Sequence, residues 1–213
     1  MPPRSLQHCV HRAFSYTRRV ERLGILGGTF DPVHVAHVAA AMAARDTLDL
    51  DRILVVVARD PWQKSDRVCA PADARFEMMA AAVEGIDRLT PSRIELDRPG
   101  PTYTIDTIEA LRHEAPTAEL YLVVGSDVAA GLDSWHRAAD LRRQVIVAVV
   151  DRDEEAAAGA PPGWRTVSVH MPRLDVSSTE LRRRIAAGEP VGGLIPAAAE
   201  RVLRSRGLYT GDR

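Results

Sequence analysis

The chain has 213 residues, of which 46% are hydrophobic and 27% charged, and its formal net charge is −1 at pH 7. This length makes one domain with a sizeable core the default, and the near-zero charge argues against a broad nucleic-acid surface. No apolar run is long enough to span a bilayer. The two cysteines, Cys9 and Cys69, have no metal-like spacing, so the chain fits a reducing cytoplasm better than a disulfide scaffold.

The first 20 residues differ from the rest of the chain. They carry several arginines and no acidic residue, which gives them a faint likeness to a transit peptide. Their apolar stretch is too short for a secretory signal. We therefore expect residues 1–20 to form a disordered extension and residues 21–213 to form a single domain.

After residue 20, apolar runs alternate with helical patterns. The expected strands are Leu23–Leu26, Ile53–Val57, Ser92–Leu96, Glu119–Val124, Val145–Val150 and Thr166–Val169. The expected helices are Val35–Leu48, Ala72–Val83, Thr104–Arg112, Glu180–Ala187 and Ala197–Arg204, with a surface loop at Asp151–Gly163. This alternation predicts an α/β fold, namely a Rossmann-like doubly wound parallel sheet with helices on both faces and a small C-terminal helical segment. Ligands of such sheets bind beyond the carboxyl ends of the strands.

The most specific stretch is Gly24–His37, with the sequence Gly-Ile-Leu-Gly-Gly-Thr-Phe-Asp-Pro-Val-His-Val-Ala-His. We expect the first strand to break at Gly27 and Gly28, where the backbone can turn tightly and a ligand can come close. His34 and His37 then share one face of the helix start, over exposed first-turn amides. A strand, a glycine turn and a helix N-terminus predict an anion site. The glycine spacing fits neither a Walker loop nor the dinucleotide fingerprint.

A second candidate phosphate site begins at Ser177. Ser177 and Glu180 form the pattern of a capping box, which predicts a helix start. Capping alone explains these two residues, but it explains Ser178, Thr179 and Arg182 less well, and their hydroxyl, amide and guanidinium groups suit phosphate oxygens. Two helix starts far apart in sequence predict a polyphosphate held between them, which favours a transferase over a simple binding protein.

These motifs resemble those of the nucleotidyltransferases with a HIGH-type motif, and most closely the bacterial nicotinate-nucleotide adenylyltransferase family. The resemblance extends from about Gly24 to Tyr209, with Ala36 where the family has glycine and Val176 where it has isoleucine. It implies an ATP site made of Gly27, Gly28, Thr29, Phe30, His34, His37, Gly125, Asp127, Ser178, Thr179 and Arg182. Asp127 would face the ribose hydroxyls, although a strand-to-helix cap is the alternative interpretation of Gly125-Ser126-Asp127.

Three further segments resemble the acceptor side of the same family, namely Pro61–Lys64, Gly100–Thr104 and Ser134–His136. The resemblance implies that Lys64 meets the mononucleotide phosphate, that Thr104 and the His136 amide meet the nicotinate carboxylate, and that Trp135 stacks on the pyridine ring. The alternatives are an exposed lysine, an N-cap at Thr102 or Thr104, and a partly buried core tryptophan. Before the first segment, Ala58-Arg59-Asp60 replaces the usual proline and small residues.

The activity that the resemblance implies is adenylyl transfer from ATP to nicotinate mononucleotide in NAD biosynthesis. His34, His37 and Arg182 would be the catalytic residues, with His37 nearest the transferring group. Mg²⁺ would arrive with ATP, because no carboxylate cage for a metal is visible. The expected partners are these two nucleotides, without nucleic acid or membrane, and a homo-oligomer is compatible with the sequence.

Several alternatives stay open at this point. One is a related adenylyltransferase that takes phosphopantetheine or nicotinamide mononucleotide, and another is a cytidylyltransferase. A dehydrogenase-like dinucleotide-binding module and a catalytically inactive nucleotide-binding regulator belong to other classes. The sequence leaves undetermined the oligomeric state, the preference for the acid over the amide, and the effect of Ala36 and Arg59-Asp60 on activity.

Overall fold

The computed structural model describes residues 19–60, 69–151 and 159–210 of the chain. In this part, six strands form one sheet in the order β3-β2-β1-β4-β5-β6, and every neighbouring pair is parallel. The strands are β1 Arg22–Gly28, β2 Arg52–Val57, β3 Leu89–Ser92, β4 Glu119–Gly125, β5 Ile146–Asp151 and β6 Thr166–His170. The predicted parallel α/β sheet is therefore confirmed.

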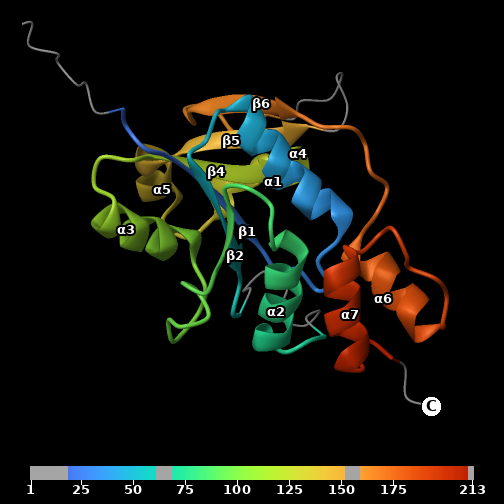
Figure 1. The fold of residues 1–213 in the computed structure, drawn as a ribbon. Coiled ribbons are helices and arrows are strands. Elements are labelled where there is room, and N and C mark those ends of the chain that lie inside the picture. Colours follow the sequence, from blue (N-terminus) through green and yellow to red (C-terminus); the bar gives the residue numbers. More distant parts are fainter. Residues whose placement is uncertain (1–18, 61–68, 152–158, 211–213) are drawn as a thin grey trace, which may run out of the picture.

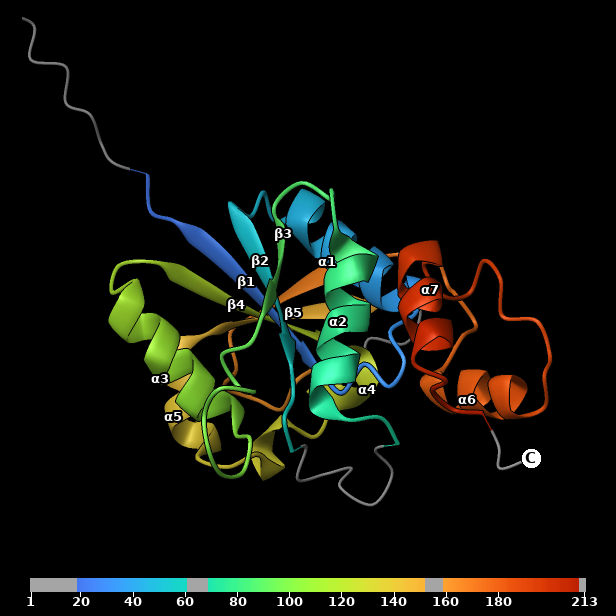
Figure 2. The same cartoon turned by 60° about the horizontal axis from the view of Figure 1, so that its bottom comes forward.

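Helices cover both faces of this sheet, as predicted. They are α1 Val35–Thr47, α2 Ala72–Val83, α3 Thr104–Glu114, α4 Ser126–Ala129, α5 Ala138–Gln144, α6 Ser178–Ala186 and α7 Ala197–Ser205, with a short 3₁₀ turn η2 at Leu132–Ser134. Figure 1 and Figure 2 show α3 and α5 on one side of the sheet and α1, α2 and α7 on the other. None of these helices, within the described ranges, has the length and apolar character needed to cross a membrane.

Each face has its own hydrophobic core. The buried residues Ala44, Met78 and Leu203 belong to the core under α1, α2 and α7, whereas Ile108 and Leu141 belong to the core under α3 and α5. The central strands contribute alternate residues to the two cores, because successive side chains of a strand point to opposite faces. This explains why their sequences are nearly continuous in valine, isoleucine and leucine.

Two predictions about local structure are wrong. The first strand does not break at the two glycines, because Gly27 and Gly28 pair in register with Val56 and Val57 of β2. The third strand is Leu89–Ser92, whereas Ser92–Leu96 was expected. It is an edge strand, where a proline such as Pro91 is tolerated. The short helices between β4 and β5 were not predicted, since none is long enough to show a helical period.

The strand order reverses direction between β1 and β4. The chain leaves β1 toward β2 and β3 on one side, and β4 begins the half of the sheet that continues to β5 and β6. The crossover helices therefore diverge at the carboxyl ends of β1 and β4, which is where open α/β sheets bind ligands.

Candidate active site

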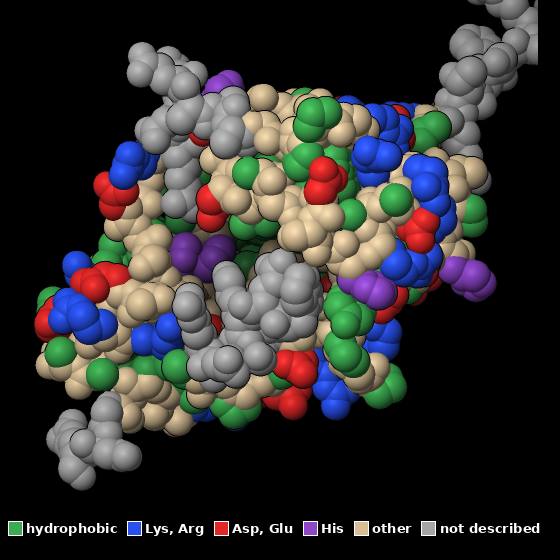
Figure 3. Space-filling view, turned by 180° about the vertical axis from the view of Figure 1, so that it is seen from behind, with side chains coloured by type: hydrophobic (Ala, Val, Ile, Leu, Met, Phe, Trp, Pro, Cys, Tyr) green, Lys and Arg blue, Asp and Glu red, His purple; other side chains and the backbone are tan. Residues whose placement is uncertain are grey.

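A cavity of about 520 Å³ lies at the carboxyl ends of β1 and β4. Figure 3 shows a hollow in this side of the molecule with histidine side chains at its edge. Of the predicted site residues, the cavity is lined by Gly27, Gly28, Thr29, Phe30, His37, Thr104, Gly125, Asp127, Trp135, His136, Ser178, Thr179 and Arg182. His34 is not among the lining residues, and Lys64 lies outside the described residues. The structure thus brings nearly all of the predicted side chains to one place.

The two glycines of the motif have different roles. A Cβ atom on Gly27 would have no atom within 4 Å, because the backbone there faces the cavity. A Cβ atom on Gly28 would lie 2.8 Å from Cζ of Phe30, whose ring covers it. Phe30 itself has a φ of 50°, in the left-handed region that larger side chains rarely adopt. Gly27 therefore leaves room for a ligand, and Gly28 leaves room for Phe30.

His34 and His37 form a stacked pair at the start of α1. Their ring centroids are 3.6 Å apart, and the Nδ1 atom of His37 accepts a hydrogen bond from the backbone N–H of His34 at 3.2 Å. His34 is the N-cap residue and is 5% exposed, whereas His37 lines the cavity. Since Nδ1 of His37 accepts, the neutral ring carries its proton on Nε2 and presents an N–H donor there.

The expectation of exposed amides in the first turn of α1 is wrong for two of them. The Val35 N–H donates to the Leu194 carbonyl oxygen at 3.0 Å, and the His37 N–H donates to the His34 carbonyl oxygen at 3.0 Å. Ala36, at the position where glycine was expected, is buried and lines the cavity. Fewer backbone N–H groups than expected are therefore open to an anion at this helix start, whereas the His37 side chain lines the cavity.

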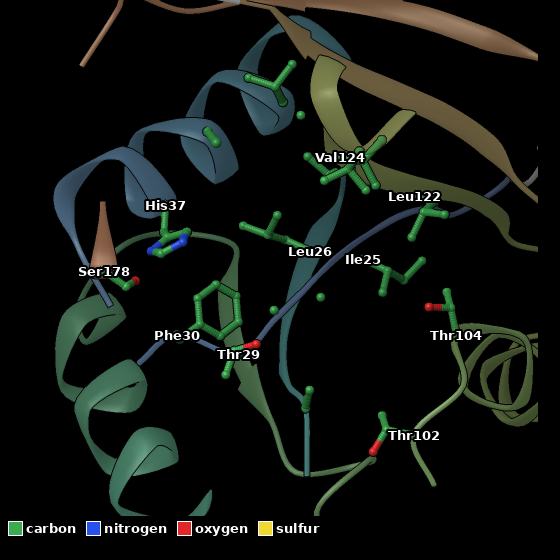
Figure 4. A pocket seen from close by; sticks show the side chains of 18 of the residues that line it. Ile25, Leu26, Thr29, Phe30, His37, Thr102, Thr104, Leu122, Val124 and Ser178 are labelled. Atoms are coloured by element: carbon green, nitrogen blue, oxygen red, sulfur yellow. The ribbon is translucent and has the colours of Figure 1, made fainter. Parts of the chain in front are cut away.

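Helix α6 begins directly against the loop that follows β1. The Ser177 side chain accepts a hydrogen bond from the Glu180 N–H at 3.2 Å, so the predicted cap is confirmed. The Ser178 hydroxyl donates to the Pro32 carbonyl oxygen at 2.9 Å, and Arg182 Nη1 donates to the Asp31 carbonyl oxygen at 2.7 Å. Figure 4 shows Ser178 close to His37 at one end of the cavity. The two predicted phosphate sites thus face one space, which we call the phosphate end.

The adjacent arginines have a structural role. Arg183 and Arg184 pair with Glu180 on the outer side of α6. These hydrogen bonds, first from Arg183 and then from Arg184, lower the pKa of Glu180 to about 2. Arg182 is the arginine of this run that lines the cavity.

Next to the phosphate end lies a polar cluster that sequence reasoning missed. It contains two buried charged residues, Asp31 at 3% exposure and Arg75 at 1%, and the partly buried Tyr209, whose hydroxyl donates to Asp31. Arg75 Nη1 donates to the carbonyl oxygens of Thr29 at 2.7 Å and Ala58 at 2.8 Å. Burial lowers the pKa of Arg75, and the nearby Asp31 charge opposes that shift. Arg75 thereby connects Thr29, which follows β1, to Ala58, which follows β2.

The opposite end of the cavity, the acceptor end, is formed by the start of α3 and the segment after β4. The N-cap of α3 is Tyr103, so neither Thr102 nor Thr104 has that position. The Tyr103 ring stacks on that of His136 with centroids 4.2 Å apart. Trp135 packs against the second core and also lines the cavity. Trp135 can therefore be a partly buried core residue and still present its ring to a ligand in the cavity.

A buried carboxyl group also lines the acceptor end. Glu95 is 7% exposed and accepts a hydrogen bond from the Thr107 hydroxyl at 2.7 Å. Burial raises the pKa of Glu95, while the Thr107 hydrogen bond and the Arg98 charge oppose that shift. Sequence reasoning missed this residue because one acid among charged neighbours carries no pattern.

The residues before the acceptor loop have defined contacts. Arg59 Nη1 donates to the Arg98 carbonyl oxygen at 3.0 Å, and the Asp60 N–H donates to the Thr102 hydroxyl oxygen at 3.1 Å. The unusual Arg59-Asp60 pair therefore connects the end of β2 to the chain before α3.

Gly125 and Asp127 mark the end of β4. A Cβ atom on Gly125 would lie 2.7 Å from Oδ1 of Asp127, so glycine allows that carboxylate to fold back over the strand end. Both residues line the cavity, and the contact of Asp127 with a ribose stays a prediction. Among the described residues, no group of three or more His, Cys, Asp or Glu side chains is arranged to hold a metal ion.

The sequence also matches known proteins. Residues 25–184 match the family described as cytidylyltransferase-like. A protein named "Probable nicotinate-nucleotide adenylyltransferase" from Nocardioides sp. is 42% identical over 188 residues, which cover 86% of this chain and 92% of that protein. A protein of the same name from Thermus thermophilus is 40% identical, covering 88% and 99%.

The fold has solved counterparts. A structure described as Plasmodium falciparum nicotinic acid mononucleotide adenylyltransferase complexed with NaAD has a TM-score of 0.71 and 20% sequence identity. The match covers 89% of this chain and 97% of that one. At this identity the likeness concerns the fold.

Proposed function

This chain belongs to the nicotinate-nucleotide adenylyltransferase family, and from that premise we propose that it transfers the adenylyl group of ATP to nicotinate mononucleotide. The products are nicotinate adenine dinucleotide and pyrophosphate, and the reaction is a step of NAD biosynthesis. The observation that carries the proposal is that His37 of α1, Arg182 of α6 and Trp135 all line one cavity at the point where the strand order reverses.

The chemistry needs little from the protein beyond positioning and charge. A phosphate oxygen of the mononucleotide attacks the α-phosphorus of ATP, the bond to the bridging oxygen breaks, and pyrophosphate leaves with the electron pair. The attacking phosphate is already ionised at neutral pH, so no general base is required. The barrier comes from the approach of two anions, which fixed donors lower.

At the phosphate end we assign the transferring group to His37 and the leaving pyrophosphate to Arg182 and Thr179. Arg182 has five N–H donors, and its hydrogen bonds to Asp31 and Thr179 leave others for phosphate oxygens. The Ser178 hydroxyl proton is engaged with Pro32, so Ser178 would donate to a phosphate oxygen through its backbone N–H. His34 lies behind His37 and would hold that ring in place.

At the acceptor end we assign the nicotinate carboxylate to Thr104 and the His136 amide, and the pyridine ring to Trp135. The positive end of the α3 dipole favours a carboxylate over an amide. Lys64 stays a proposal for the mononucleotide phosphate. Mg²⁺ would enter as part of the ATP substrate, because hard phosphate oxygens suit it.

The test measures pyrophosphate release from ATP with three acceptors in parallel. These are nicotinate mononucleotide, its amide and phosphopantetheine. We expect the highest kcat/KM with nicotinate mononucleotide, because the acceptor end combines a helix start with an aromatic ring. Faster release with phosphopantetheine would contradict the proposal. A ratio of acid to amide near one would remove the assigned role of the α3 start.

Two further parts of the proposal concern the cellular compartment and the oligomeric state of the enzyme. We propose a cytoplasmic enzyme, because the two cysteines show no disulfide pattern and both substrates are small metabolites. Size-exclusion chromatography with light scattering will give the oligomeric state, for which a homo-oligomer is one outcome.

A further inference from the structure

We infer that Tyr209, in the turn after α7, is a positioning residue that holds Asp31 and through it sets Arg182 for ATP. The inference deepens the proposed function, because it concerns the same phosphate end. It depends on that function only for the identity of the acceptor.

Asp31 connects its own loop to three other parts of the chain. Its Oδ1 atom accepts from the Tyr209 hydroxyl at 2.7 Å and from the Ala70 N–H at 3.0 Å. Its Oδ2 atom accepts from the Cys69 N–H at 2.7 Å and lies 3.8 Å from Nη1 of Arg182. A carboxylate with this many donors has a defined orientation, and buried networks of this kind are stiff when every member is satisfied.

Arg182 depends on the same residue in two ways. Its Nη1 atom donates to the Asp31 carbonyl oxygen at 2.7 Å, and the Asp31 carboxylate attracts it from slightly farther away. Only 20% of the Arg182 side chain is exposed, so these contacts largely fix where its remaining donors point. The two contacts must stay balanced for the guanidinium to face the cavity.

Tyr209 maintains that balance. Its hydroxyl neutralises part of the charge on Oδ1, so the carboxylate pulls less strongly on the guanidinium. Burial first, and the hydrogen bond to Asp31 second, raise the pKa of Tyr209, so the hydroxyl stays protonated and remains a donor. Loss of this donor would leave Asp31 with more unshared charge, which would draw Arg182 toward it and away from the phosphates.

The turn that carries Tyr209 is itself well anchored. The Leu208 N–H donates to the Leu203 carbonyl oxygen at 3.1 Å, and Arg206 pairs with Glu77 of α2. Leu208 and Tyr209 both pack against the core under α2 and α7. These contacts fix the position of the Tyr209 hydroxyl, as a positioning role requires.

The first experiment compares Tyr209→Phe with a matched control. Tyr209→Phe keeps the ring and removes only the hydroxyl. Thr210→Val removes the neighbouring hydroxyl, which donates to the Gly207 carbonyl oxygen at 3.0 Å on the exposed side of the same turn. We expect Tyr209→Phe to raise the Kd for ATP, measured by calorimetry, and to lower kcat/KM for ATP. Each change should be about tenfold, which corresponds to the loss of about one hydrogen bond between the displaced Arg182 and a phosphate oxygen. Thr210→Val should change neither value.

A double-mutant cycle separates positioning from general loss of stability. If Tyr209 acts through Arg182, then Tyr209→Phe should have little further effect on the Kd for ATP in an Arg182→Ala background. Equal effects in both backgrounds would overturn the inference, because the hydroxyl would then act independently of Arg182. An unchanged Kd and kcat/KM for Tyr209→Phe alone would also overturn it. Thermal unfolding of every variant accompanies the binding data and confirms that each is folded.

The test of Tyr209 and the test of the proposed function can fail independently of each other. Adenylyl transfer by the unmodified enzyme tests the acceptor, whereas the calorimetric cycle needs ATP alone. If nicotinate mononucleotide were not a substrate, the proposed function would fail, and the ATP cycle would still decide the role of Tyr209.

Discussion

The two ends of the cavity are built differently. The phosphate end rests on a polar network in which the buried Asp31, the partly buried Arg182 and the Tyr209 hydroxyl come from distant parts of the chain. The acceptor end consists of a helix start and nearby rings, among which Tyr103 stacks on the exposed His136. A polyphosphate needs donors at fixed positions, whereas a flat ring needs only a flat surface. Mutations should therefore affect turnover more at the phosphate end and substrate affinity more at the acceptor end.

The largest expected effect comes from His37→Ala. Removing the donor nearest the transferring phosphoryl group should lower kcat by two or more decades, corresponding to about 3–4 kcal/mol for a lost transition-state donor. Steady-state pyrophosphate release measures it. The exposed His113 at the end of α3 provides the control, since His113→Ala should leave kcat unchanged. A near-normal kcat for His37→Ala would show that the phosphate end does not work as proposed.

A pair of glycine variants sharpens the distinction between backbone that faces a ligand and backbone that faces protein. Gly27→Ala should raise the KM for ATP about tenfold without lowering the thermal midpoint, because the added methyl group meets only open cavity. Gly28→Ala should instead destabilise the fold by about 1–3 kcal/mol, because the methyl group clashes with Phe30. Denaturant unfolding and initial-rate kinetics measure the two effects. The reverse pattern would exclude close approach of the nucleotide at Gly27.

At the acceptor end, Trp135→Ala should mainly raise the KM for nicotinate mononucleotide. We expect an increase of about fivefold, since stacking of an aromatic ring on a pyridinium contributes about 1 kcal/mol. The KM for ATP should hardly change, and Trp135→Phe should restore most of the affinity. An equal rise for both substrates would count against stacking.

The smallest effect concerns Glu95 and pH. Its folded-state pKa lies above its ordinary value of 4.5, so the native protein binds more protons than the unfolded chain there. The protonated Glu95 therefore makes its full contribution to the free energy of unfolding below pH 4.5. This contribution is lost as the pH rises through the folded-state pKa. Glu95→Gln should therefore raise the thermal midpoint at pH 8 by no more than about 3 °C, and the gain should shrink as pH falls toward 4.5. A difference that does not vary with pH would contradict this reasoning.

Local patterns predicted most of the fold and the residues that converge on the cavity. Helix α2 has both predicted ends, because Pro71 and an apolar stripe define it. Arg75 could have been suspected, since it interrupts that stripe with a charge. The contact between Asp31 and Tyr209 could not, because 178 residues separate them and neither forms part of a periodic pattern. The different roles of Gly27 and Gly28 likewise depend on where Phe30 packs, which spacing does not reveal.

The hydrogen bond between Tyr209 and Asp31 has consequences for the synthesis of the protein and for the placement of affinity tags. Ribosomes add about 5–20 residues each second, so roughly 10–35 s pass between synthesis of the aspartate and arrival of its tyrosine partner. During that time the nascent domain carries an incompletely paired carboxylate beside its nucleotide cleft. Affinity tags and other insertions are therefore best kept away from the turn that carries Tyr209, because its hydroxyl completes the hydrogen bonds of Asp31.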